Sequence, residues 1–334
     1  MKRFFCQCGQ EIFFENSHCN RCGSLLGFDP EQRQLLSLTP KSNDVFSTQQ
    51  GDFKRCQLHT APVHCNWLIP LNSRNQQCAS CRLTQLIPNQ NTLINQRRWQ
   101  VLESAKRRLL YGLLSLKLPV FDTEPRLIFE FLEDQQTNPN VGLEHVLSGH
   151  VNGRITLNAA EADGSYREAA REAMNEPYRT LLGHFRHEVG HFYWLLLIRD
   201  SAKSSEFETL FGNPHQEYSA ALNHYYQHGP AQHWQTTFIS AYASAHPLED
   251  WAETWAHYLL MQETLETALA FDLISQPEKK AGDTLWMTEW YQLVTILNAL
   301  NRSTGNADAY PFVISPVVKQ KLQFIDNLIH PTVR

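Results

Sequence analysis

The stretch NEPYRTLLGHFRHEVGHFYWLLLIRD, residues 175–200, decides the fold and the chemistry that we expect of this chain. Apolar side chains recur through it at helical spacing, which predicts a helix buried along one side, and Pro177 suits the first turn of that helix. His187 and His191 are one helical turn apart, so both imidazoles point toward a single metal ion. Glu188 is rotated by one residue and can reach a water on that metal.

The five residues HEVGH by themselves allow two interpretations. Histidine pairs at this spacing arise by chance, and the chain holds 15 histidines. In a zinc hydrolase, the metal lowers the pKa of its bound water toward about 7, and Glu188 takes the proton and passes it to the leaving amine. Gly190 leaves room for another element to approach the helix closely. A working site then needs a third ligand on another segment.

HPLEDWAETWAHYL, residues 246–259, supplies candidates for that ligand. Glu249 and Glu253 are one turn apart on a largely apolar helix, where carboxylates are costly to bury unless they are paired or bind metal. One can ligate zinc while the other hydrogen-bonds a ligand histidine. We expect Glu249 to be the ligand, because in glutamate-type zincins the earlier acid generally ligates. Glu253 as the ligand stays open, and so does the interpretation that both are solvated surface charges.

The cysteines indicate two further metal sites, since all eight lie in the first 81 residues. A cytosolic chain keeps its thiols reduced, so paired cysteines at this spacing are typical of zinc ligands. Gly9 and Gly23 suit the tight turns of the first set, and His59 or His64 is close enough to replace a cysteine of the second. Some cysteines could instead be buried apolar residues. The two sets are Cys6, Cys8, Cys19 and Cys22, and Cys56, Cys65, Cys78 and Cys81.

The composition of the 334 residues is that of an ordinary folded protein, with 42% hydrophobic and 19% charged residues. The net charge of -5 gives no global attraction to nucleic acid or anionic lipid. No segment approaches the roughly 20 apolar residues of a membrane span, and the N-terminus lacks a secretory signal. We therefore expect a cytoplasmic protein without a membrane partner.

The remaining pattern predicts an α+β fold. Residues 1–90 are rich in cysteine and turns, whereas the pattern beyond them is mostly helical. Residues 126–132 predict a strand, and residues 145–158 predict a hairpin with Asn152-Gly153 as its turn. Further helices are predicted over residues 97–116, 165–176, 212–229, 246–271, 283–301 and 315–329.

Segments along nearly the whole chain resemble the bacterial family of zinc-binding metallopeptidases that carry an N-terminal zinc-ribbon domain. The resemblance implies a zinc peptidase but does not define its substrates. It is carried by CQCGQEIFFENSHCNRCGSLLGFDP, CNWLIP, AKRRLLYGLLSLKLP, GHVNGRITLNAAEAD, EPYRTLLGHFRHEVGHFYW and HPLEDWAETWAHYL.

The pentapeptide EDWAE, residues 249–253, also resembles the ExxAE helix of lethal-factor-like gluzincins, whose first glutamate is the ligand. Those enzymes have a tyrosine seven residues before that glutamate, and Tyr242 holds the place here. We therefore expect Tyr242 to donate a hydrogen bond to the oxyanion of the reaction, with plain packing as the alternative. The segment GRITLN, residues 153–158, is a candidate edge strand that could pair with an extended substrate, although an interior strand would show the same pattern.

These observations predict a small zinc-ribbon domain over residues 1–90 and a zincin-like, mostly helical metallopeptidase domain with a small sheet over residues 91–334. We expect one catalytic and two structural zinc ions. The expected activity is hydrolysis of a peptide or protein substrate by a zinc-activated water, with Glu188 as general base and acid. The alternatives are a zinc-ribbon binding module for nucleic acid or protein, with a vestigial zincin scaffold, and a zinc hydrolase of non-peptide amides.

Overall fold

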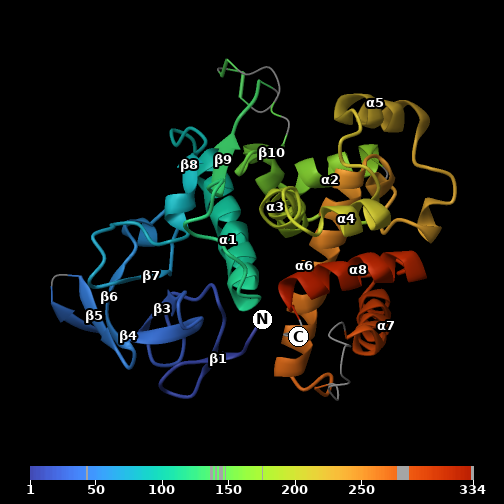
Figure 1. The fold of residues 1–334 in the computed structure, drawn as a ribbon. Helices are drawn as coiled ribbons and strands as arrows, with labels where there is room; N and C mark the ends of the chain where they lie inside the picture. Colours follow the sequence, from blue (N-terminus) through green and yellow to red (C-terminus); the bar gives the residue numbers. More distant parts are fainter. Residues whose placement is uncertain are drawn as a thin grey trace. The chain divides into compact units, whose positions relative to one another are not determined.

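A computed structural model describes residues 1–42, 44–135, 138–139, 141–142, 146, 148–174, 176–276 and 286–331 of the chain. It consists of two compact units, Lys2–Ala173 and Met174–Arg334, the second including Met1. Figure 1 shows strands in the first unit and mostly helices in the second. Within the described ranges, no helix combines the length and the hydrophobicity needed to cross a lipid bilayer.

The described part of the first unit holds a two-stranded ribbon, a five-stranded sheet and a four-stranded sheet. The five-stranded sheet is antiparallel in the order β3-β4-β5-β6-β7, and the four-stranded sheet has the order β10-β11-β9-β8. The strands are β1 (Phe4–Phe5), β2 (Glu11–Ile12), β3 (Leu25–Asp29), β4 (Gln34–Ser42), β5 (Val45–Thr48), β6 (Gly51–Arg55), β7 (Leu68–Pro70), β8 (Thr84–Leu86), β9 (Ile128–Leu132), β10 (Gly149–Val151) and β11 (Arg154–Asn158).

Helix α1 (Leu93–Ser115) is part of the first unit. Its N-cap is Thr92, whose side chain accepts a hydrogen bond from the backbone of Asn95. Its Tyr111 joins an aromatic cluster with Phe14 and Phe28, at ring-centroid distances of 5.4 and 6.1 Å. Phe28 lies on β3 and is fully buried. Aromatic packing of this kind therefore ties the cysteine-rich sheet to α1.

The predicted hairpin is present as β10 and β11, joined at Asn152 and Gly153, which both have positive φ angles. Residues 145 and 147 of that prediction lie outside the described residues. Of the two alternatives for residues 153–158, the structure shows the interior strand and not the edge strand, because β11 lies between β10 and β9. The predicted strand at 126–132 is confirmed as β9, and α2 (Gly164–Ala173) follows the hairpin.

The second unit is helical, and its helices agree with most of the predicted segments. Residue 175 and residues 283–285 of those predictions lie outside the described residues, and α4 was not predicted. Two predicted starts are wrong: the helix expected from Pro177 begins at Leu181, and the one expected from Asn213 begins at Tyr218. The helices are α3 (Leu181–Leu197), α4 (Ser204–Phe211), α5 (Tyr218–His228), α6 (Pro247–Ala270), α7 (Met287–Ser303) and α8 (Pro316–Ile329).

Candidate metal centres

Helices α3 and α6 approach each other closely at Gly190, as the sequence predicts. A Cβ atom at this position would lie 3.0 Å from Cα of Ala252 and 3.3 Å from Cβ of Trp255. The indole nitrogen of Trp251 donates a hydrogen bond of 2.8 Å to the Gly190 carbonyl. Any side chain here would push the two helices apart by a few tenths of an ångström, so glycine favours the approach that brings the histidines of α3 to the acids of α6.

His187, His191 and Glu249 converge on one point in the second unit. Nε2 of His187 lies 3.3 Å from Nε2 of His191 and 3.1 Å from Oε2 of Glu249, and Nε2 of His191 lies 3.4 Å from Oε1 of Glu249. Zinc holds such ligands at about 2.0–2.1 Å in a tetrahedron, whose edges are then about 3.3 Å long. The three donors therefore have the spacing that one zinc ion requires.

The charges of this triad also suit a divalent cation. Burial raises the pKa of Glu249, but His191 and His187 lower it by more, so its pKa lies well below the usual range. Burial lowers the pKa of His187, but Glu249 and Glu253 raise it by more, so its pKa is well above the usual value. The buried carboxylate of Glu249 and the half-buried one of Glu253 thus hold a positive charge between them, which a metal ion supplies as well as a proton does.

Glu253 contacts the other side of the same imidazole. Its Oε1 lies 2.7 Å from Nδ1 of His187, and its Oε2 accepts a hydrogen bond of 2.6 Å from Ser240. The structure thus brings Glu249, and not Glu253, against the ring nitrogens that face the centre. A carboxylate on the far nitrogen fixes the tautomer and the orientation of a ligand histidine. Sequence reasoning did not identify Ser240.

Glu188 is buried beside the triad, one residue after His187. Its Oε1 lies 3.3 Å from Nε2 of His184. Its Oε2 is buried and, among the described residues, has no hydrogen-bond partner. Burial raises the pKa of Glu188, but His184 and His187 lower it by more, so the net shift is downward. This carboxylate therefore has a free acceptor atom and a preference for the charged form.

Two tyrosines border the centre. The ring of Tyr242 lies 6.0 Å from that of His187, packs on Tyr225 at 5.7 Å and interacts through its hydroxyl with Tyr226. Tyr218, at the start of α5, donates a hydrogen bond of 2.5 Å to Oε1 of Glu249. The sequence analysis missed Tyr218, because no motif links a tyrosine to a glutamate 31 residues later.

The first cysteine set converges in the first unit. Sγ of Cys6 lies 3.6 Å from that of Cys22, and Sγ of Cys8 lies 3.7 Å from that of Cys19. Four sulfurs at about 2.3 Å from zinc are about 3.8 Å apart, whereas a disulfide would bring two of them to about 2.05 Å. Gly9 and Gly23 have φ angles of 80° and 72°, so the tight turns predicted for them are confirmed. Cys22 is exposed at this site.

The second cysteine set also converges, and all four of its members are buried. Sγ of Cys65 lies 3.6 Å from those of both Cys78 and Cys81, and the backbone N–H of Cys78 points at Sγ of Cys56 over 3.4 Å. The two histidines considered as replacements stay outside the set: the ring of His59 contacts the Cys56 carbonyl at 2.9 Å, and His64 is exposed.

Helix α1 places buried charges beside the second set. Glu103 lies 4.0 Å from Sγ of Cys81 and forms a buried ion pair of 2.9 Å with Lys106. Arg107 is 6% exposed, and its Nη1 has no hydrogen-bond partner among the described residues. Burial lowers the pKa of Arg107, but the cysteines and Glu103 raise it by more. A zinc ion with four thiolates carries a charge of −2, which Arg107 partly offsets.

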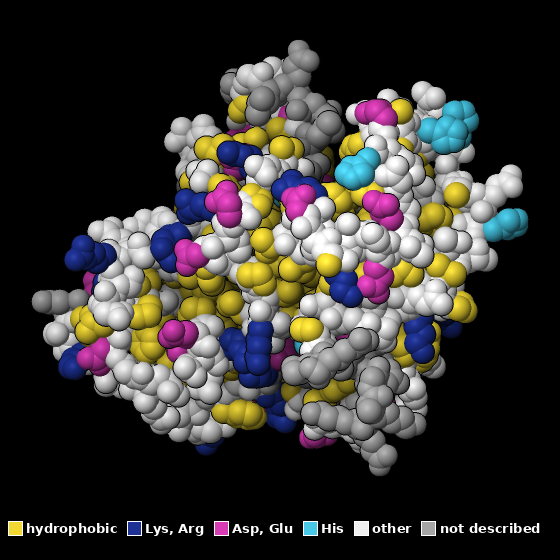
Figure 2. Space-filling model, in the orientation of Figure 1, with side chains coloured by type: hydrophobic (Ala, Val, Ile, Leu, Met, Phe, Trp, Pro, Cys, Tyr) yellow, Lys and Arg dark blue, Asp and Glu magenta, His cyan; other side chains and the backbone are white. Residues whose placement is uncertain are grey.

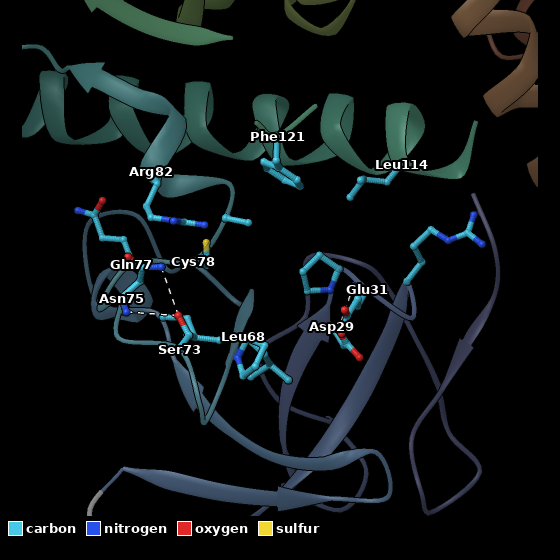
Figure 3. Close-up of a pocket in the computed structure, with 15 residues that line it drawn as sticks. Asp29, Glu31, Leu68, Ser73, Asn75, Gln77, Cys78, Arg82, Leu114 and Phe121 are labelled. Carbon is cyan, nitrogen blue, oxygen red and sulfur yellow. Dashed lines mark hydrogen bonds between the residues drawn. The ribbon is translucent and has the colours of Figure 1, made fainter. Parts of the chain in front are cut away.

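A cavity of about 400 Å³ opens within the first unit, beside the second cysteine set (Figure 3). Leu68, Leu114 and Phe121 give it apolar walls, with Arg82 on one side and Asp29 on another. Of the residues predicted to form sites, the cavity is lined by Cys78 alone. The triad on α3 and α6 is therefore the candidate centre for chemistry.

Proteins of Mycobacterium tuberculosis and Mycobacterium bovis are similar to the chain over its whole length. Each is 40% identical over 343 aligned positions, which cover 98% of this chain and 95% of the relative. Both are described only as uncharacterized proteins. No solved structure matches the chain.

Two family models account for most of the chain. Residues 3–92 match a zinc-ribbon domain, and residues 95–328 match the family described as "Putative zinc-binding metallo-peptidase". The second match contains both α3 and α6, so the histidines and acids that converge in the structure belong to one family region. The chain belongs to this zinc-binding metallopeptidase family and carries a zinc-ribbon domain ahead of its family region.

Proposed function

We propose that this chain is a zinc-dependent peptidase whose metal is held by His187, His191 and Glu249. The observation that carries the proposal is the spacing of 3.1–3.4 Å between these donors, next to a buried carboxylate with a free oxygen, Glu188. Zinc in such a site lowers the pKa of a water molecule and polarises a carbonyl oxygen. The four cysteines of each remaining set would hold a structural zinc ion.

The protein's own residues have separate tasks in this reaction. Glu188 accepts the proton of the attacking water at Oε2 and delivers it to the leaving amine. Glu253 and Ser240 hold the imidazole of His187 in one orientation. Tyr242 is assigned the hydrogen bond to the oxyanion, a role that the distance of 6.0 Å between its ring and that of His187 supports. The proposed substrate is a peptide or protein, and the reduced cysteines suit a cytoplasmic location.

The test is the Glu188→Gln variant, compared with the wild type on a peptide library. Glutamine preserves the shape of the side chain but removes the base, so cleavage should fall by at least 100-fold while the zinc content stays unchanged. Glu206, an exposed acid on α4, provides the matched control, and Glu206→Gln should cleave like the wild type.

The activity of the wild-type protein separates the peptidase proposal from its two alternatives. A wild-type protein that carries zinc at the triad but cleaves no peptide would contradict the peptidase proposal. Cleavage of amides outside peptides, again lost in Glu188→Gln, would favour the broader class of zinc amide hydrolases. Retention of an RNA or protein partner by the zinc-ribbon region, without any hydrolysis, would favour a binding module.

A further inference from the structure

Helix α5 contacts the candidate centre without joining the hydrophobic core. None of its residues, Tyr218–His228, is buried, and glycines with positive φ angles, Gly212 and Gly229, lie on either side. Figure 2 shows histidines gathered on the surface at and beside α5, and His224 and His228 are both exposed. The opposite face therefore makes the contacts of α5 with the rest of this unit.

The inner face of α5 carries two tyrosines, Tyr218 and Tyr225, which are seven residues apart. The ring of Tyr225 packs on Tyr242 at 5.7 Å, and the ring of Tyr218 packs on His246 at 5.1 Å. His246 is the N-cap of α6, three residues before Glu249. Aromatic contacts of this kind fix the direction of a side chain as well as its depth. They aim the hydroxyl of Tyr218 at Glu249.

The two oxygens of Glu249 have different surroundings. Oε1 accepts the 2.5 Å hydrogen bond from Tyr218 and lies 3.4 Å from Nε2 of His191. Oε2 is buried, lies 3.1 Å from Nε2 of His187 and has no hydrogen-bond partner among the described residues. A buried carboxylate oxygen without a partner destabilises the folded state, unless something else satisfies it. A metal ion at the triad would satisfy Oε2, since Oε1 is already satisfied.

We propose that Tyr218 is a positioning residue for the metal ligand: its hydroxyl engages Oε1 of Glu249, so that Oε2 is the oxygen left to bind the metal. The inference rests on the proposed zinc site of His187, His191 and Glu249. With one carboxylate oxygen bound elsewhere, Glu249 supplies a single donor atom, and the metal keeps a position open for water. Without the phenol, the carboxylate can rotate and offer both oxygens, which would fill that position.

The test compares Tyr218→Phe with Tyr291→Phe in the full chain loaded with zinc. Both substitutions remove one hydroxyl from the second unit, but Tyr291 lies on α7 and is 47% exposed. Competition with a colorimetric chelator should release one zinc ion from Tyr218→Phe at a 10–100-fold lower chelator concentration than from the wild type. The Tyr291→Phe variant should lie within about threefold of the wild type. Equal zinc retention in all three proteins would overturn the proposal.

Cobalt substitution at the triad gives a second measurement that does not depend on activity. Visible absorption of cobalt weakens as its coordination number rises, so Tyr218→Phe should absorb less per cobalt than the wild type. An unchanged spectrum would overturn the claim that Tyr218 selects one oxygen. If Tyr218→Phe weakens metal binding while the wild type cleaves no peptide, the positioning role stands and the peptidase proposal fails. If His187→Ala retains every zinc ion of the wild type, the metal site itself is wrong, and this inference falls with it.

Discussion

At the scale of single residues, His257 lies one helical turn after Glu253 and is held in its neutral form. The side chain is 7% exposed, and Nδ1 lies 2.8 Å from the hydroxyl of Tyr310. The ring also packs edge-on against Phe312 at 4.4 Å. Burial lowers the pKa of His257 from 6.5 to about 4, with Glu253 raising it and Arg186 lowering it further. Folding is therefore less favourable at a pH at which the unfolded chain carries a proton on this ring, because the folded chain has to release that proton.

This residue predicts a pH dependence of stability. The unfolded chain binds the proton near pH 6.5 and the folded chain only near pH 4, so stability is complete above pH 6.5 and is lost as the pH falls toward 4. Between pH 7 and pH 5 the loss from this group is about 2 kcal/mol. Urea unfolding of the wild type and His257→Gln at both pH values should show that difference. The exposed His215→Gln variant is the control, and equal pH slopes in the wild type and His257→Gln would contradict the assignment.

The residues of the candidate centre were predictable to the extent that they belong to local patterns. His187 and His191, like Glu249 and Glu253, meet because one helical turn separates each pair, and helical spacing is visible in a sequence. The choice of Glu249 over Glu253 as the acid that faces both imidazoles required the structure. The contact of Tyr218 with Glu249 depends on where α5 packs, and local spacing carries no information about such packing.

At the scale of elements, α8 is connected to the candidate centre through Lys321. Its ammonium group lies 2.6 Å from Oδ2 of Asp250 on α6 and donates a hydrogen bond of 2.8 Å to the carbonyl of Thr237. Both charged side chains are 1% exposed. Thr237 lies three residues before Ser240, which donates a hydrogen bond to Glu253. One lysine thus joins three segments of the second unit around the candidate centre.

Replacing this lysine should destabilise the unit strongly. Lys321→Met leaves Asp250 buried without its cation, and breaking a buried pair in this way costs about 3–5 kcal/mol. Chemical denaturation at pH 8 should report that loss, because burial raises the pKa of Asp250 to about 7 and the carboxyl is then charged. The double variant with Asp250→Asn should regain part of the stability. A single variant within 1 kcal/mol of the wild type would show that the pair is not needed.

Predictions of elements failed where two local signals competed or where no signal stood out. Pro177 suits a helix start, but the helix begins after Thr180, whose hydroxyl accepts a hydrogen bond from the backbone of Gly183. Residues 153–158 alternate as a half-buried strand does, and alternation is the same for an edge strand and an interior one. The sheet from β3 to β7 was not predicted, because cysteines and turn residues dominate the pattern of the first 90 residues.

At the scale of the whole molecule, the chain should bind three zinc ions. We expect metal analysis to find three per wild-type chain and two in each of His187→Ala, Cys19→Ser and Cys78→Ser, because each change removes one donor of a separate site. Chelator should remove the zinc of the first cysteine set before that of the second, since Cys22 is exposed and the second set is buried. Loss of two ions in any single variant, or fewer than three in the wild type, would contradict three independent sites.

The family matches and the compactness of the structure divide the chain at different residues. The family matches divide the chain between residues 92 and 95, whereas compactness divides it between Ala173 and Met174. Strands β9, β10 and β11 and nearly all of helix α1 lie between these points, inside the metallopeptidase match but in the compact unit of the cysteines. The division predicted near residue 90 rests on cysteine content and stays a prediction.

The segment that belongs to the metallopeptidase match and also to the first compact unit includes Arg107 and Lys106. Both stand on α1, outside the zinc-ribbon match, yet the cysteines of the second set raise the pKa of Arg107, and Lys106 pairs with Glu103, which lies 4.0 Å from Sγ of Cys81. A ribbon transplanted between relatives by cutting at residue 92 would therefore leave behind the charges that balance its own thiolates. For exchange between proteins, the transferable piece is the ribbon together with its helix.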